Sequence, residues 1–144
     1  MKKFDLLSYV LGIVGTALIW FPLLAPVVLG LTTLIYDGIF RFDYLIPMEV
    51  FPSVLLGGIL LVWAARRLHS HLPLLGWSFG IAVALFFGTQ LLAVVTGLAS
   101  GENEAVGWRV WLVMSGLVGY ILALLVMAAG GLLLIRDLRL RSRA

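Results

Sequence analysis

The residues of this chain that could take part in chemistry are few, and the most informative of them is Glu49. It lies in an apolar stretch between Pro47 and Pro52. A carboxylate inside a membrane costs roughly 3 kcal/mol at the bilayer centre unless it is paired or reached by water. Two hypotheses stay open: a structural ion pair with Arg109, and an outward-facing polar pocket in which Glu49 binds a proton, a small cation or an amine-containing ligand.

The pocket hypothesis requires neutral polar side chains at the depth of Glu49. Ser53 continues the same helical face four residues further on. The later apolar stretches carry threonine, glutamine and serine in the halves that reach the same side of the membrane. The residues that we expect to line this ligand or ion pocket are Glu49, Ser53, Thr89, Gln90, Arg109 and Ser115.

Catalytic and metal chemistry finds little support in the sequence. The chain has no cysteine, no paired carboxylates within its apolar stretches and no metal-ligand spacing. His69 and His71 are two residues apart and would point to different sides of a helix, so we expect them in a solvated turn. We therefore predict no catalytic residue, no metal site and no cofactor, and an enzyme acting on lipid is the least favoured class.

The elements that must position these residues are membrane-spanning helices. Apolar residues make up 62% of the 144 residues, charged residues 12%, and the mean hydropathy is +1.14. This composition is too apolar for a soluble fold, and an apolar run of about 20 residues crosses a bilayer as a helix. We predict an all-α polytopic membrane protein, a four-transmembrane-helix bundle with short loops. Its single transmembrane domain, residues 1–144, has spans at about 6–36, 44–65, 72–99 and 106–135.

Two sequence features predict how these spans are shaped and packed. Pro22 and Pro26 each remove a backbone hydrogen bond from the first span, so we expect a kink between Trp20 and Pro26. In the third span a small residue recurs at every fourth position, and such a groove lets another helix approach closely. We expect helix packing at Gly76, Gly80, Ala84 and Gly88, and at Gly119 in the last span.

The distribution of lysine and arginine predicts the orientation. With the N terminus inside, the cytoplasmic residues are Lys2, Lys3, Arg66, Arg67, Arg136, Arg139, Arg141 and Arg143, against Arg41 and Arg109 outside. This excess predicts a multi-pass protein of the cell membrane, plasma or inner, with both termini in the cytoplasm. Since the basic residues lie at span ends, the net charge of +3 gives no reason to expect a nucleic-acid partner.

Two function classes are favoured over a membrane enzyme. The first is a small binding or transport protein that acts as a homo-oligomer around the Glu49 pocket. The alternative is a non-catalytic accessory or assembly subunit of a larger membrane complex, which receives partner helices on its small-residue faces. The expected partners are membrane lipids and either a second copy of the chain or a partner membrane subunit.

Overall fold

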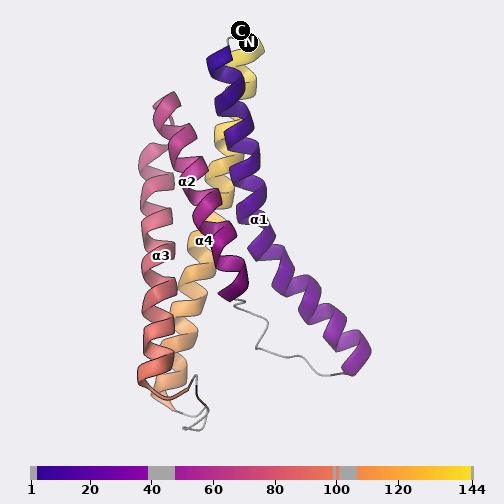
Figure 1. The fold of residues 1–144 in the computed structure, drawn as a ribbon, viewed down its shortest axis with the longest axis vertical. Helices are drawn as coiled ribbons and strands as arrows, with labels where there is room; N and C mark the ends of the chain where they lie inside the picture. The colour runs from indigo at the N-terminus through magenta and orange to yellow at the C-terminus, as the bar shows by residue number, and fades with distance from the viewer. Residues whose placement is uncertain (1–2, 39–47, 99, 101–106, 144) are drawn as a thin grey trace.

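The protein is an all-α membrane bundle. The computed structural model describes residues 3–38, 48–98, 100 and 107–143 (Figure 1). These residues form the helices α1 (Lys3–Asp37), α2 (Phe51–Leu68), α3 (Leu72–Val95) and α4 (Trp108–Arg143), with a single 3-10 turn, η2 (Met48–Val50), leading into α2. The described part contains no strand, and all four helices are long and apolar enough to cross a membrane. The predicted four-helix fold class is therefore confirmed.

The largest differences between the helix ends and the predicted span ends are in the second, third and fourth spans. The α-helix of the second span begins at Phe51, and positions 44–47 of that predicted span lie outside the described residues. The third helix ends at Val95, because Gly97 takes a left-handed conformation with φ +71° that stops a helix. The fourth helix continues to Arg143, well past the predicted end at 135, since a helix does not have to stop where its apolar part stops.

The helix that departs most from the direction of the other three is α1. Figure 1 shows this helix bend partway along and diverge from the other three, and Pro22 and Pro26 lie in this middle part of it. The bend agrees with the kink expected from the two prolines. Residues 27–37, which we call the α1 arm, follow the bend, and their large apolar side chains are exposed, up to 76% for Ile35 and 84% for Tyr36.

The first half of α1 is held against α2 by a contact between two backbones. A Cβ built on Gly57 would lie 2.9 Å from the carbonyl oxygen of Gly15, and one built on Gly15 would lie 3.0 Å from the carbonyl oxygen of Gly57. Real Cβ atoms are rarely found so close to a backbone atom, so the two helices approach as closely as glycine allows. The first half of α1 also packs on α4, while α3 packs mainly on α4.

The centre of the bundle is a row of aromatic rings shared by three helices. Phe51 at the start of α2 stacks on Phe86 of α3 with ring centroids 3.7 Å apart, and Phe86 lies 5.6 Å from the ring of Tyr120 in α4. Further along, the fully buried side chains include Leu61, Leu75, Leu124, Met127 and Leu134. The first residue of α2 is therefore level with Phe86 in the second half of α3 and close to the level of Tyr120 in the first half of α4.

Gly57 and Gly80 provide a matched test of this packing. We expect Gly57→Ala to lower the free energy of unfolding by about 1–3 kcal/mol, because the added methyl group meets the backbone of α1. Gly80→Ala should not destabilise the protein, since no atom lies within 4 Å of its built Cβ and alanine favours a helix. Thermal unfolding of both variants in the same detergent measures the difference. Equal stability of the two variants would contradict the α1–α2 contact.

Candidate functional site

Glu49 lies in η2, and its side chain is exposed. Figure 1 shows the start of α2 beside the bend of α1, nearer to the end of the bundle where α3 finishes and α4 begins than to the end with the two termini. Phe51, two residues further on, stacks on Phe86 in the core, and Phe86 lies nine residues before the last residue of α3, Val95. Among the described residues, no ion pair or hydrogen bond joins Glu49 to another side chain.

Arg109 does not reach Glu49. It is exposed in the first turn of α4, with its guanidinium carbon 5.9 Å from the centroid of the Trp108 ring. It precedes Tyr120 by eleven residues, or about 16 Å at 1.5 Å per residue, whereas Glu49 lies close to the level of Tyr120. The described contacts therefore give no support to the structural Glu49–Arg109 pair.

The serines predicted for the pocket are bonded to their own helices. Ser53 is half-buried and donates to the carbonyl oxygen of Val50 at 2.6 Å. Ser115 is exposed and donates to the carbonyl oxygen of Leu112 at 2.8 Å. Such bonds to a carbonyl in the preceding turn are the usual way in which serine is accommodated in a helix, and they use the single hydroxyl donor.

Thr89 and Gln90 lie on α3, and Thr89 is a packing residue. It is buried, and its hydroxyl group lies so close to Gly116 that a Cβ on Gly116 would collide with it. Gly119, one turn further along α4, likewise meets Leu85, whose Cδ1 would lie 3.0 Å from its Cβ. Gln90 is half-buried. Thr89 and Gly119 thus belong to the α3–α4 contact. Among the described residues, no hydrogen bond or ion pair joins the six predicted pocket residues to one another.

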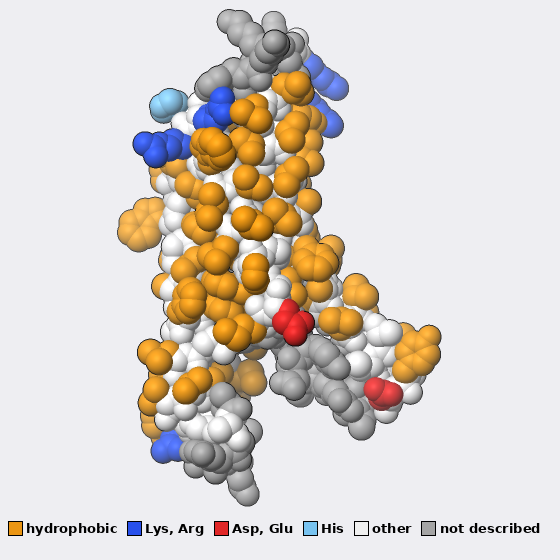
Figure 2. Space-filling view, viewed as in Figure 1, with side chains coloured by type: hydrophobic (Ala, Val, Ile, Leu, Met, Phe, Trp, Pro, Cys, Tyr) orange, Lys and Arg blue, Asp and Glu red, His pale blue; other side chains and the backbone are white. Residues whose placement is uncertain are grey.

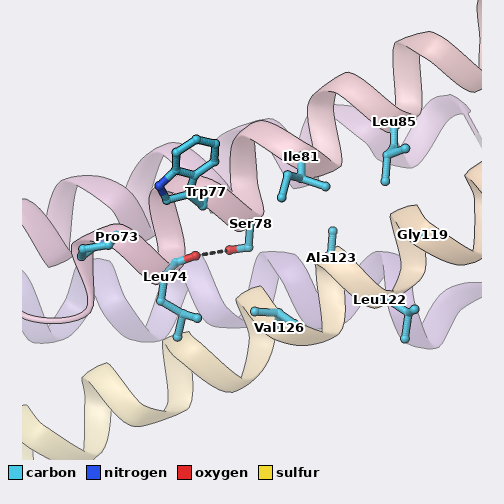
Figure 3. Close-up of a pocket in the computed structure, with 10 residues that line it drawn as sticks. All are labelled: Pro73, Leu74, Trp77, Ser78, Ile81, Leu85, Gly119, Leu122, Ala123 and Val126. Atoms are coloured by element: carbon cyan, nitrogen blue, oxygen red, sulfur yellow. Dashed lines mark hydrogen bonds between the residues drawn. The ribbon is translucent and has the colours of Figure 1, made fainter.

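Two cavities lie elsewhere and are lined mainly by apolar side chains. A crevice of about 110 Å³ lies where α1 bends away from α4; we call it the α1–α4 crevice. Its lining consists of Pro22, Leu23, Pro26, Val27, Tyr120, Ile121 and Leu124. A groove of about 640 Å³ runs along α3 and α4 (Figure 3), and we call it the α3–α4 groove. Neither is lined by any of the six predicted pocket residues.

The polar contact that the sequence did not predict is at the other end of the molecule. The imidazole Nε2 of His71 lies 2.9 Å from Oδ2 of Asp137, and the hydroxyl of Ser70 donates to the same oxygen at 3.2 Å. His71 was expected in a solvated turn, but it is half-buried and ties the α2–α3 turn to the end of α4. The signal in the sequence is that Asp137 is the single carboxylate among the C-terminal arginines.

The cluster consists of the Asp137 carboxylate and two side chains that bond to it, Ser70 and His71. Asp137 lies beyond the predicted span 106–135, and the hydrogen bond from His71 lowers the pKa of its carboxyl below the ordinary value. The turn itself is tight, with His69 and His71 in left-handed conformations at φ 51° and 56°. No group of three or more possible metal ligands occurs among the described residues, and the cluster acts as a connection between elements.

A double-mutant cycle on Glu49 and Arg109 tests the hypothesis of a structural ion pair between them. We expect the effects of Glu49→Gln and Arg109→Gln on the free energy of unfolding to add, with a coupling energy below about 0.5 kcal/mol, because distant residues without shared partners do not couple. Thermal unfolding of the two single variants and the double variant gives this value. A coupling energy of about 2 kcal/mol or more would instead indicate a direct ion pair in a desolvated site.

Comparison of the chain with protein-family models, with curated proteins and with solved structures finds no match. The assignment of a function to this protein therefore depends on its own residues, their burial and their contacts.

Proposed function

We propose that this small multi-pass membrane protein is a non-catalytic subunit of a larger membrane complex, and that a helix of its partner packs between the α1 arm and α4. The observation that carries this proposal is the bend of α1 away from the bundle (Figure 1). The bend leaves the large apolar side chains of the α1 arm exposed, and apolar side chains of α4 such as Met114 and Val118 are exposed as well. A membrane helix from another protein is the element of the right length and chemistry to cover both.

The burial of α1 changes at its bend, and this change supports the proposed contact surface. Ile19 and Pro22 are buried, whereas from Val27 onward the large side chains of α1 are exposed, with 57% for Val27 itself. The α1–α4 crevice lies at the point of divergence and is closed by Tyr120 and Ile121 of α4. Met114, two turns before Ile121 on the same helical face, is 38% exposed. The surface thus runs from the crevice along both helices.

Glu49 supplies the polar part of the same surface. Figure 1 shows η2 beside the bend of α1, so this exposed carboxylate lies at the start of the open space. A carboxylate at membrane depth is stabilised by a partner group, and hydrogen bonds between helices contribute about 0.6–2 kcal/mol in a bilayer. We propose that Glu49 accepts a hydrogen bond from a basic or hydroxyl side chain of the partner helix.

The small-residue face of α3 is a second candidate surface for the same partner. Apart from the surrounding turns of α3 itself, no atom of the described residues lies within 4 Å of a Cβ built on Gly76, Gly80 or Gly88. Ala84 and Gly80 are exposed, so this predicted packing face is not used inside the bundle. Small residues without an internal neighbour allow a close approach by an external helix.

Ligand binding or transport by a homo-oligomer around Glu49 is less well supported. The serine hydroxyls predicted as ligands donate to carbonyl oxygens of their own helices, and Thr89 is buried against Gly116. A complete site would require polar groups from a second copy of the chain. We therefore favour the subunit function, in which Glu49 needs a single polar contact.

The orientation of the bundle is part of the proposal. The α2–α3 turn and the end of α4 lie together, as the His71–Asp137 contact requires, and they carry Arg66, Arg67 and Arg136. We place this end in the cytoplasm by the positive-inside rule. Cysteine introduced at Ser70 or Ser142 should react with a membrane-impermeant maleimide only after the membrane is opened, whereas cysteine at Ser100 should react in intact cells. The reverse pattern would overturn the orientation.

Site-specific photo-crosslinking tests the partner contact. A photoreactive side chain at Val27 or at Met114 should crosslink to one and the same membrane protein, because both positions face the open space between the α1 arm and α4. Glu49→Leu should reduce the yield at both positions. Mass spectrometry of the crosslinked product gives the identity of the partner.

The control position is Ile59 of α2, which is 52% exposed and lines neither the crevice nor the groove. It should give no crosslink to the same protein. A second copy of the chain as the only crosslinked product would favour the homo-oligomer instead. Crosslinks to lipid alone at Val27 and Met114 would overturn the subunit proposal.

A further inference from the structure

We infer that the α3–α4 groove binds an acyl chain of an anionic phospholipid, whose headgroup lies among the arginines at the same end of the bundle. The groove begins at Pro73, in the first turn of α3, and continues to Leu85 and Gly119. Figure 3 shows Trp77, Ser78 and Ile81 of α3 on one side and Leu122, Ala123 and Val126 of α4 on the other. Its volume of about 640 Å³ is within the usual range of small-ligand sites, roughly 300–1,000 Å³.

The chemistry of the lining favours a hydrocarbon chain. Ser78 carries the one hydroxyl among the lining residues, and this hydroxyl donates to the carbonyl oxygen of Leu74 at 2.7 Å (Figure 3). Its remaining contact, at 3.2 Å, is with the carbonyl oxygen of Leu75. Ser78 therefore offers no uncommitted donor to a polar ligand, and the other side-chain donor of the lining is the indole N–H of Trp77, a residue that is 75% exposed. A polar group bound deeper in the groove would lose its hydrogen bonds to water. The side chain of Trp77, 75% exposed, forms a flat wall at the edge.

The length and position of the groove match one membrane leaflet. From Pro73 to Leu85 the helix rises about 18 Å at 1.5 Å per residue, and half of a bilayer's hydrocarbon core is about 15 Å thick. The groove starts at the helix end next to the α2–α3 turn and stops near the middle of the bundle. An acyl chain that enters from the headgroup region at that end would fill it along its length.

Charge complementarity identifies the headgroup. Arg66 and Arg67 form the last turn of α2, just before the turn that leads to Pro73. The contact between His71 and Asp137, at 2.9 Å, brings the end of α4 with Arg136 and Arg141 to the same turn. Figure 2 shows basic side chains gathered toward the upper end of the bundle. Clusters of lysine and arginine at the membrane surface attract anionic headgroups by about 1 kcal/mol per residue.

The carboxylate of this cluster does not oppose such a ligand in the way that an unpaired acid would. Asp137 accepts hydrogen bonds from Ser70 and His71, and these two hydrogen bonds partly offset its negative charge. Six arginines lie at or beyond this end of the spans: Arg66, Arg67, Arg136, Arg139, Arg141 and Arg143. The balance of charge at the mouth of the groove is positive.

Native mass spectrometry of the purified full-length protein, with phosphatidylglycerol or phosphatidylcholine added in detergent, tests the inference. The wild type should retain one phosphatidylglycerol in preference to phosphatidylcholine. Val126→Trp should lose it, because the indole fills the groove, whereas Leu125→Trp should retain it. These neighbouring residues are similarly exposed, 42% and 44%, and Leu125 does not line the groove. Trp77→Ala removes an exposed wall without filling the groove, and it should also weaken retention.

The headgroup contact has its own control. The double variant Arg136→Gln, Arg141→Gln should lower the preference for phosphatidylglycerol by about fivefold for each arginine removed, whereas Arg109→Gln, at the other end of α4, should leave it unchanged. Equal retention of both lipids by the wild type, or equal retention by the Val126→Trp and Leu125→Trp variants, would overturn the inference. So would a Val126→Trp variant that changes the oligomeric state but keeps its lipid, since the groove would then be a protein interface.

Discussion

The contact between the backbones of Gly15 and Gly57 determines how the rest of the bundle is arranged. In a membrane there is no water to drive helices together, so association depends on close packing of the kind that two glycines permit. This contact fixes the first half of α1 against α2, with built Cβ atoms only about 3 Å from the opposing carbonyl oxygens. The first half of α1 is fixed by this contact, so the kink at Pro22 and Pro26 changes the direction of the second half alone. The α1 arm therefore diverges from the bundle.

The same contact explains the position of Glu49. Gly57 sets the height of α2 beside α1, and the start of α2 is then fixed by the stacking of Phe51 on Phe86. The 3-10 turn that carries Glu49 is therefore held next to the bend of α1. An exposed carboxylate and the exposed apolar α1 arm are thus two results of one packing arrangement. This is why we treat them as parts of a single surface.

The sequence predicted the fold well, whereas the pocket around Glu49 stays a prediction, for physical reasons that particular residues make clear. Length and apolarity decide which segments span a membrane, and proline decides where α1 bends. By contrast, the small-residue series of α3 predicts a smooth face but does not identify the helix that covers it. Among the described residues, no neighbouring helix lies within 4 Å of a Cβ built on Gly80. The contact between the backbones of α1 and α2 joins Gly15 to Gly57, which are remote in the sequence. Ser53 and Ser115 illustrate a similar limit: a helical serine can bond a ligand or its own backbone, and both here donate to their own helices.

The unequal lengths of α2 and α4 have a consequence for the surrounding bilayer. The described part of the second span, η2 and α2, contains 21 residues and is about 30 Å long, close to the ordinary thickness of the hydrocarbon core. The apolar part of α4, from Trp108 to Ile135, is about 42 Å long and packs in the same bundle. The protein therefore presents different hydrophobic heights around its perimeter. The bilayer next to α4 must thicken locally or the helix must tilt. This hydrophobic mismatch favours membranes whose hydrocarbon core matches the length of α4.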